Sequence, residues 1–404
     1  MSPEIEQAIS IVLYYIGPFI LVPLALLVLW IVWHRYIQMW NTFFGEPWTL
    51  IEIVLPKEIF KSPRAMEVVA GGFNQGYAGN WWTKFWSGTI RTWFSLEMVS
   101  LGGQVHFYIR TLKLFKHLIE SQIYAQYGDV EIREVEDYVH LVKYGREPGW
   151  EIWGAQQKLT KPDPYPIRTY VDYGLDNESL KEETKTDPIS TTVEYLGSLG
   201  PNEYAFIQIL VQATKPRYKI PGFWMKKGNW QDEGKDLIMK LTKQDKVREG
   251  ELNLGSLKLS PGEVEVAKAV EKSLSKLGFD CGIRIIYGAK KEHYDLSHRL
   301  ALKNLFTQYN TLNLNGFDSI TTDVDSVLMN LFKLRASKER FLKTTILNAY
   351  RLRSYFYAPF KYKPFVLNTE ELATIYHFPG GVITTAGLPR IESKKAEPPK
   401  NLPI

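Results

Sequence analysis

An acidic pair and a histidine lie close together near the end of this 404-residue chain. Glu370 and Glu371 precede His377 by one to two helical turns. Carboxylates and an imidazole at such a spacing are able to ligate a metal ion or to form an acid–base pair. The three side chains are therefore the strongest candidate active site in the sequence, provided that one element points them at a common ligand.

A short capped helix is the element that the surrounding residues predict. Asn368 or Thr369 is suited to cap its amino end, and an acidic first turn favours helix initiation through capping and the macrodipole. Pro379 and the two glycines after it end the pattern. This interpretation gives each polar residue a local structural function, so we predict no catalytic residue. An enzymatic hypothesis could rest only on the two glutamates and the histidine.

Motifs for nucleotides and metals are absent from the sequence. A phosphate-binding loop needs G-x-x-x-x-G-K-[ST], and the nearest string, which begins at Gly228, has the wrong spacing and lacks the hydroxyl. His293 and His298 are too far apart for one helix face. The single cysteine, Cys281, excludes an intrachain disulfide and a thiolate zinc site. We predict no metal and no cofactor, and a reducing, cytosolic setting for most of the chain.

Residues 1–40 predict a membrane anchor. Ala8–Trp33 contains no ionisable residue and is long enough to span a bilayer as a helix. Positive charge follows this span, which predicts a single-pass protein of the cell (inner) membrane with its N-terminus outside and its bulk in the cytoplasm. Trp30, Trp33 and Trp40 are expected at the inner interface. The alternative is a buried core helix, although globular helices are seldom apolar all round over this length.

An order of β-α-β-β-α-β follows the anchor over residues 46–145. Two alternating strands around Gly102 and Gly103 predict a β-hairpin, and helical spacing follows over Leu112–Gly128. Further strand patterns stand before and after these elements. Residues 46–145 are therefore expected to form a ferredoxin-like (split βαβ) unit, and the fold class is α+β.

A second ferredoxin-like unit is predicted over residues 146–290, with one of its strands at Tyr165–Tyr173. A polar, basic insertion at 215–259 would be a mobile loop or a partner-binding surface. Residues 291–381 have the spacing of a helical segment. Residues 382–404, rich in proline and lysine, are expected to be an extended tail or linker.

The tryptophan-rich stretch Trp81–Phe94 has two interpretations. Tryptophan sits well at the depth of lipid headgroups, so Trp81, Trp82 and Trp86 are candidates for an interfacial anchor near the transmembrane helix. The stretch would equally suit an ordinary loop that packs on the sheet. The sequence leaves both open.

The stretch Phe332–Phe365 is strongly basic, with Glu339 as its only acid, in a chain of net charge +5. Basic residues interleaved with aromatic ones are able to bind phosphate backbones and to stack bases. The candidates for nucleic-acid or lipid binding are Arg351, Arg353, Lys361 and Lys363. The alternative is a helix with a solvated basic face and its aromatic residues in the core.

Several strings carry a resemblance to a known family. They are SLEMVSLGGQVHFYIRTLKLFKHLIESQIYAQYGDVEIREVEDY, YLGSLGPNEYAFIQILVQ, YRLRSYFYAPF, FVLNTEELATIYHFPGG and AEPPKNLP. In these strings the chain resembles the N-terminal, membrane-anchored region of type IV secretion and conjugation coupling-type (HerA-like) ATPases. The resemblance covers most of residues 46–404. In such proteins a string like EPPKNLP leads into the motor domain with its P-loop, and this sequence stops there. The gene would then be split, or the chain would be a stand-alone relative, or it would be a fragment of a longer product.

This resemblance implies a non-enzymatic, membrane-anchored cytoplasmic scaffold in a system that translocates DNA or protein. Its expected partners are the membrane and either further copies of the chain or a P-loop ATPase, while contact with DNA stays open. The alternative is a structural subunit of another membrane complex, which would bind lipid or protein through Trp81–Phe94 and residues 215–259.

Overall fold

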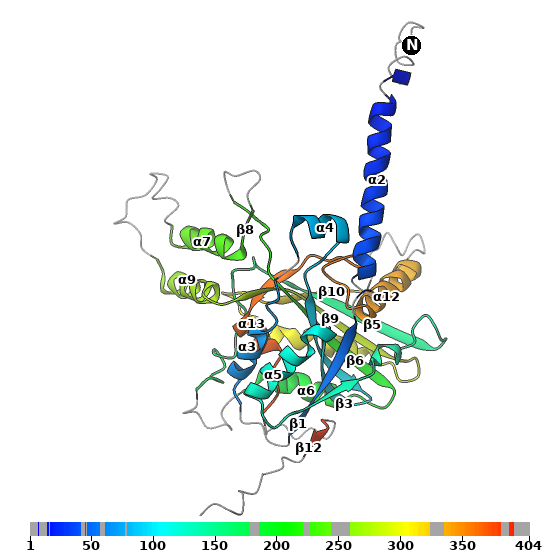
Figure 1. Cartoon of the computed structure of the whole chain (residues 1–404). Coiled ribbons are helices and arrows are strands. Elements are labelled where there is room, and N and C mark those ends of the chain that lie inside the picture. Colours follow the sequence, from blue (N-terminus) through cyan, green and yellow to red (C-terminus); the bar gives the residue numbers. More distant parts are fainter. Residues whose placement is uncertain are drawn as a thin grey trace, which may run out of the picture.

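A single apolar helix projects from an α+β module in the computed structural model (Figure 1). The structure describes residues 7, 14–15, 17–41, 45, 47–56, 61–76, 79–177, 186–220, 227–243, 259–323, 335–380 and 388–391. The projecting helix, α2 (Gly17–Trp40), has 24 residues, which gives a length of about 36 Å. It is long and apolar enough to cross a membrane. The expected span began earlier, and its residues 8–13 lie outside the described part of the chain.

The module is built on one large, mostly antiparallel sheet. Its strands are β1 (Trp48–Pro56), β2 (Trp93–Leu101), β3 (Gln104–Leu112), β4 (Glu131–Val135), β5 (Trp150–Leu159), β6 (Glu203–Ala213), β9 (Gly278–Lys290), β10 (Phe317–Thr321), β11 (Phe365–Asn368) and β12 (Arg390–Ile391). The order along the sheet is β10-β5-β9-β6-β2-β3-β1-β12, with β4 paired to β1 and β11 to β9. Among the described pairs only β1 with β12 is parallel. The α+β class is thus confirmed.

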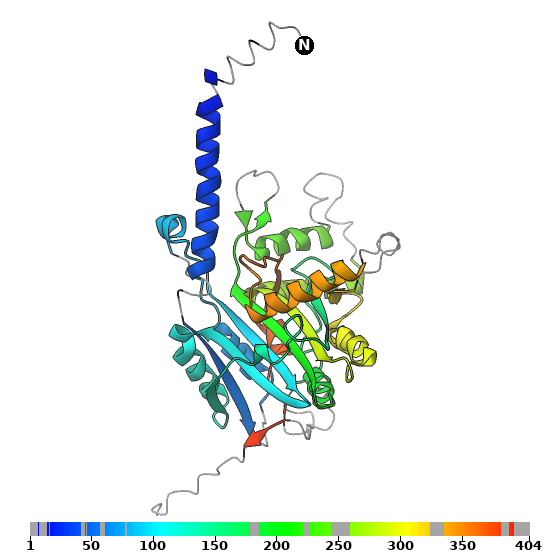
Figure 2. The ribbon, with the colours of Figure 1, turned by 90° about the vertical axis from the view of Figure 1, so that its right-hand side faces the viewer.

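The helices of the module are α3 (Arg64–Gly71), α4 (Trp81–Ser87), α5 (Lys116–Gln126), α6 (Pro188–Gly197), α7 (Trp230–Leu241), α9 (Pro261–Leu274), α10 (Leu296–Asn304), α12 (Arg335–Arg351) and α13 (Thr369–Ile375). Helices lie on both faces of the sheet, whereas α4 packs against α2 and α7 against α9 (Figures 1 and 2). One core contains Val69 of α3, Val193 of α6 and Leu372 of α13. A smaller core on the other face contains Leu347 of α12. Successive strand residues divide between the two, because side chains alternate across a sheet.

The sheet has the same strand order in its two halves. In the first, the neighbours are β4-β1-β3-β2, and in the second they are β10-β5-β9-β6. β2 and β6 join the halves edge to edge, with pairs that run from Trp93–Gln212 to Leu101–Tyr204. The sheet therefore continues across the boundary that we expected between residues 145 and 146.

Two local expectations in the second half were wrong. Residues 291–381 do contain the helices α10, α12 and α13, but they are not helical throughout, because β10 pairs with the outer edge of β5 and β11 pairs with the part of β9 that β5 does not reach. Tyr165–Tyr173 forms no strand. Side chains of α13 take up backbone N–H groups of that segment instead: Ile167 donates to Glu371 and Tyr170 donates to Thr374.

One end of the sheet, called here the α2 end, faces the projecting helix. β1 begins there at Trp48, shortly after α2, and Ala213 of β6 pairs with Phe279 of β9 at the same end. The opposite end of β9 is Lys290, which pairs with Trp150. Since β9 has 13 residues, the two ends are about 40 Å apart.

The insertion between β6 and β9 contributes a small hairpin and helix α7 at the α2 end (Figures 1 and 2). The hairpin pairs β7 (Tyr218–Lys219) with β8 (Lys227–Gly228). Residues 221–226 and 244–258 of the expected insertion lie outside the described part. So does most of the expected tail at 382–404, of which β12 is described as a strand beside β1.

Candidate functional site

Glu371 caps the helix that carries it. The Asn368 side chain accepts a hydrogen bond from the backbone N–H of Glu371 at 2.9 Å, and the Glu371 carboxylate accepts the backbone N–H of Asn368 at 2.8 Å. Its other oxygen accepts the N–H of Ile167 at 2.8 Å. Burial raises the pKa of Glu371 to about 8, while the two backbone hydrogen bonds act in the opposite direction. The predicted capped helix is confirmed, and of the two candidate caps the structure uses Asn368, which forms a capping box with Glu371.

His377 points to a different part of the molecule from the two glutamates. Its Nδ1 donates to the carbonyl oxygen of Ala373 at 2.8 Å. Its Nε2 lies 3.1 Å from the carboxylate of Asp187, which also caps α6. The imidazole is 1% exposed. His377 therefore links α13 to α6, and its hydrogen-bond partners differ from those of Glu370 and Glu371.

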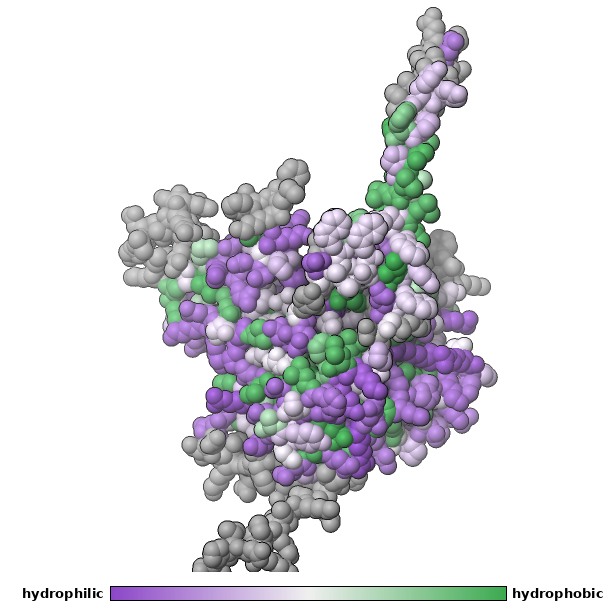
Figure 3. Space-filling view, in the orientation of Figure 1, coloured by the Kyte–Doolittle hydropathy of each residue, from purple (hydrophilic) through white to green (hydrophobic). Residues whose placement is uncertain are grey.

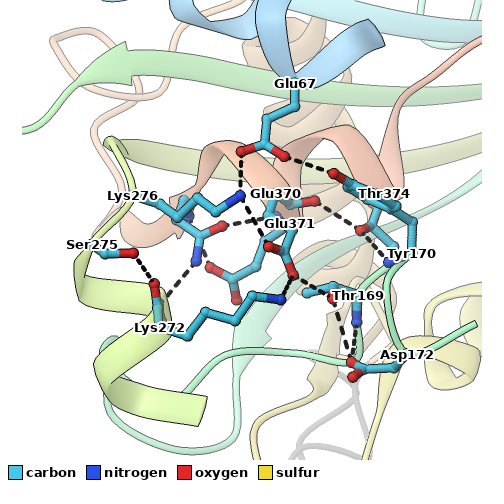
Figure 4. Close-up of polar contacts among 12 residues, drawn as sticks. Glu67, Thr169, Tyr170, Asp172, Lys272, Ser275, Lys276, Glu370, Glu371 and Thr374 are labelled. Atoms are coloured by element: carbon cyan, nitrogen blue, oxygen red, sulfur yellow. Dashed lines mark hydrogen bonds and ion pairs between the residues drawn. The ribbon is translucent and has the colours of Figure 1, made fainter. Parts of the chain in front are cut away.

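Glu370 is the member of the trio that reaches a pocket (Figure 4). Its carboxylate accepts a hydrogen bond from Thr169 at 2.6 Å and pairs with Lys272 at 3.0 Å and Lys276 at 3.1 Å. Burial opposes ionisation, but these three partners hold the pKa of Glu370 below its usual value. Lys276 also pairs with Glu67 of α3 at 2.6 Å. The cluster thus connects α3, α9 and α13.

The pocket has a volume of about 420 Å³, within the usual range for small-molecule sites. It is lined by Arg64, Glu67, Val68, Tyr170, Val171, Asp176, Lys272, Lys276, Thr369 and Glu370. Two of its acids, Glu67 and Glu370, are engaged, since Glu67 accepts hydrogen bonds from Tyr170 at 2.8 Å and Thr369 at 3.1 Å besides its ion pair. No group of three or more potential ligands for a metal ion occurs among the described residues. The ion pairs at this pocket join three helices to one another.

A second polar network lies in the sheet interior, and the sequence interpretation missed it. The guanidinium of Arg353 forms a bidentate pair with Glu97 of β2, at 2.9 and 3.0 Å. It also forms hydrogen bonds to Asp137 at 2.6 and 3.0 Å. Arg353 and Glu97 are both fully buried. The single charge at position 97, within a strand that is otherwise apolar apart from two serines, was the signal in the sequence for a buried partner.

The four basic candidates of the stretch 332–365 do not form one surface. Arg353 is enclosed by its carboxylates, so the expectation that it contacts a nucleic acid or a lipid was wrong. Arg351 is half-buried and donates to the carbonyl oxygen of Val142 at 2.6 Å. Lys361 and Lys363 are exposed at the α2 end.

The aromatic candidates gather where α2 meets α4. Trp30 is half-buried and stacks on Phe85 of α4, with ring centroids 4.9 Å apart. Trp82 and Trp86 of α4 are 61% and 65% exposed, and the side chain of Trp81 lies outside the described part. The two remaining candidates, Trp33 and Trp40, are exposed along α2 at 59% and 52%. α4 thus presents indole rings beside the end of the apolar helix.

Comparison with known proteins adds a family to this geometry. No curated protein matches the chain. A family model described as "Domain of unknown function (DUF8128)" matches residues 80–387, from the N-cap of α4 to beyond α13, and leaves out α2. Because that match covers most of the chain, the protein belongs to the DUF8128 family.

Proposed function

We propose that the protein is a single-pass membrane protein whose module acts as a non-enzymatic scaffold. The observation that carries this proposal is the exposure of α2: Phe19, Leu24 and Leu29 are 81%, 52% and 64% exposed. Apart from the contact of Trp30 with α4, this helix exposes its apolar side chains, which is unfavourable in water and stable in a bilayer. The positive-inside bias favours an N-terminus outside the cell membrane and a cytoplasmic module.

Interior chemistry supports a scaffold rather than an enzyme. Glu371 and His377 bond to groups of their own fold, and Glu370 pairs with Lys272 and Lys276. A catalytic acid or base must reach a substrate, whereas these side chains hold helices together. The repeated strand order further favours a module of two ferredoxin-like halves joined through β2 and β6.

The resemblance to coupling-type ATPases specifies the partner of this scaffold. The module would dock a P-loop ATPase, or further copies of itself, at the inner face of the membrane in a type IV secretion or conjugation-like system. Tethering to the membrane would raise the effective concentration of the two partners and so favour their association.

Two substitutions in the middle of α2 test the anchor. The double variant Leu24→Arg/Leu27→Arg should move the protein from the alkali-resistant membrane fraction to the soluble fraction, because each central arginine costs about 2.5–3.5 kcal/mol on insertion. The matched variant Leu24→Ile/Leu27→Ile should stay in the membrane. The intact mass of the membrane-bound wild-type protein should be that of a chain that retains α2. A mature chain that lacks α2 would show that it is a cleaved signal sequence.

Affinity purification tests the partner. The full chain, crosslinked in native membranes and solubilised in mild detergent, should bring down a P-loop ATPase or run as an oligomer in size-exclusion chromatography with light scattering. A monomer that retains no ATPase would contradict the scaffold. Recovery of a membrane complex without a P-loop protein would favour the alternative, a subunit of another assembly.

A further inference from the structure

Basic side chains from three segments gather at the α2 end of the sheet. They are Arg91, Lys215, Arg217, Lys361 and Lys363. Arg91 follows α4 directly, Lys215 and Arg217 follow β6, and the other two precede β11. Tyr357 links these segments, because its hydroxyl accepts the backbone N–H of Arg91 at 3.1 Å and the Gln212 side chain at 3.2 Å.

A buried carboxylate organises the inner part of this group. Asp280 is 1% exposed and forms ion pairs with Arg217 at 2.5 Å and Arg91 at 3.6 Å. Arg91 also donates to the carbonyl oxygen of Ala213, and Arg217 also pairs with Asp163 at 3.0 Å. The two arginines are thus fixed in place by the fold.

The cations around Asp280 outnumber the carboxylates close to them. Lys215, Lys361 and Lys363 are exposed, and the described part of the chain gives none of them an ion pair within 4.0 Å. Partial desolvation by neighbouring groups and the nearby Arg91, Lys361 and Arg217 lower the pKa of Lys215, against an opposing effect of Asp280. Glu233 is the third carboxylate close to the group, beside Arg217 and Lys363. Positive charge therefore exceeds negative charge at this surface.

This surface lies beside the proposed membrane anchor. In Figures 1 and 2, α4, β8 and α7 stand on the side of the module from which α2 projects. Figure 3 shows the exposed side chains of α4 next to hydrophilic surface at this level, below the hydrophobic helix. Trp30 lies within the last turns of α2 and stacks on Phe85, so a membrane-spanning α2 would hold α4 at headgroup depth.

We propose that the α2 end of the module binds the phosphate groups of anionic phospholipids. Lys215, Lys361 and Lys363 would contact the phosphates, while Trp82 and Trp86 would enter the headgroup layer. This inference rests on the proposed transmembrane position of α2. That position favours a lipid over a nucleic acid as occupant, because it places the cations and the exposed tryptophans against the bilayer surface at once.

Lipid binding by the full chain tests this inference. Native mass spectrometry in a neutral detergent would compare added phosphatidylglycerol with phosphatidylcholine. The wild type should retain phosphatidylglycerol preferentially, and Lys361→Gln/Lys363→Gln should weaken its binding on the order of tenfold while phosphatidylcholine binding stays unchanged. The control Lys290→Gln/Lys291→Gln removes the same charge from exposed lysines at the opposite end of β9 and should bind like the wild type.

Each other outcome would overturn the inference in a recognisable way. If both double variants lost phosphatidylglycerol binding equally, or if neither lost it, the α2 end would have no specific affinity for anionic lipid. Displacement of phosphatidylglycerol by millimolar glycerol phosphate would indicate a soluble phosphate ligand. If Lys361→Gln/Lys363→Gln weakened the binding of a single-stranded oligonucleotide but not the binding of phosphatidylglycerol, the occupant would be a nucleic acid. Alkaline extraction, run in parallel, reports separately on whether α2 is a membrane anchor.

Discussion

Arg353 and Lys361 stand eight positions apart in the same basic stretch, yet the fold uses them in opposite ways. Arg353 is fully buried, and two carboxylates from distant parts of the chain, Glu97 and Asp137, neutralise it. Lys361 is exposed at the α2 end, and no carboxylate among the described residues forms an ion pair with it. A basic run in the sequence therefore does not by itself predict a basic surface, because residues from other elements determine which of its cations are buried.

Removing the charge at each position should separate the two roles most strongly. Arg353→Met leaves Glu97 buried without its cation and should lower the free energy of unfolding by about 3–5 kcal/mol. Lys361→Met should change it by less than about 0.5 kcal/mol. Denaturant titration of the detergent-solubilised protein measures both.

A second substitution checks the cause of that loss. The double variant Arg353→Met/Glu97→Gln removes the unpaired buried charge and should regain part of the lost stability. Equal stabilities of the Arg353→Met and Lys361→Met variants would contradict the distinction between the two sites.

Two neighbouring acids of α13, Glu370 and Glu371, should affect the pH dependence of stability in different ways. The folded pKa of Glu371 is about 8, above its ordinary value of 4.5, so the folded state binds more protons between these values. Stability should therefore fall by about 3–4 kcal/mol as pH rises from about 5 to 8. Glu371→Gln should remove this slope in thermal unfolding measured across that range.

Glu370→Gln is the matched control for this pH dependence. Against the effect of burial, the hydrogen bond from Thr169 and the two lysines lower the pKa of Glu370, so its contribution to stability is present above pH 4.5 and is lost as pH falls. Its substitution should leave the slope between pH 5 and 8 in place. An unchanged slope in Glu371→Gln would show that other groups cause it.

Local patterns in the sequence predicted the elements better than their partners. The cap at Asn368 and the acid at Glu371 stand within one turn, so a capping rule finds them. The ion pair between Glu97 and Arg353 joins residues 256 positions apart, and no local pattern encodes such a contact. The segment around Ile167 was misjudged for the same reason, because its backbone hydrogen bonds go to side chains of α13 and to the backbone of Tyr309 and Asn315, and not to a neighbouring strand.

The depth of two surface positions in a bilayer tests the central claim most directly. Cys281 is fully buried, so spin labels attach selectively to Ser87→Cys, in α4, or to Lys291→Cys, beyond the far end of β9. In full-length protein reconstituted into lipid nanodiscs, power saturation should place the label at position 87 at headgroup depth and the label at 291 in water. Equal exposure of both labels to a water-soluble nickel chelate would contradict the account.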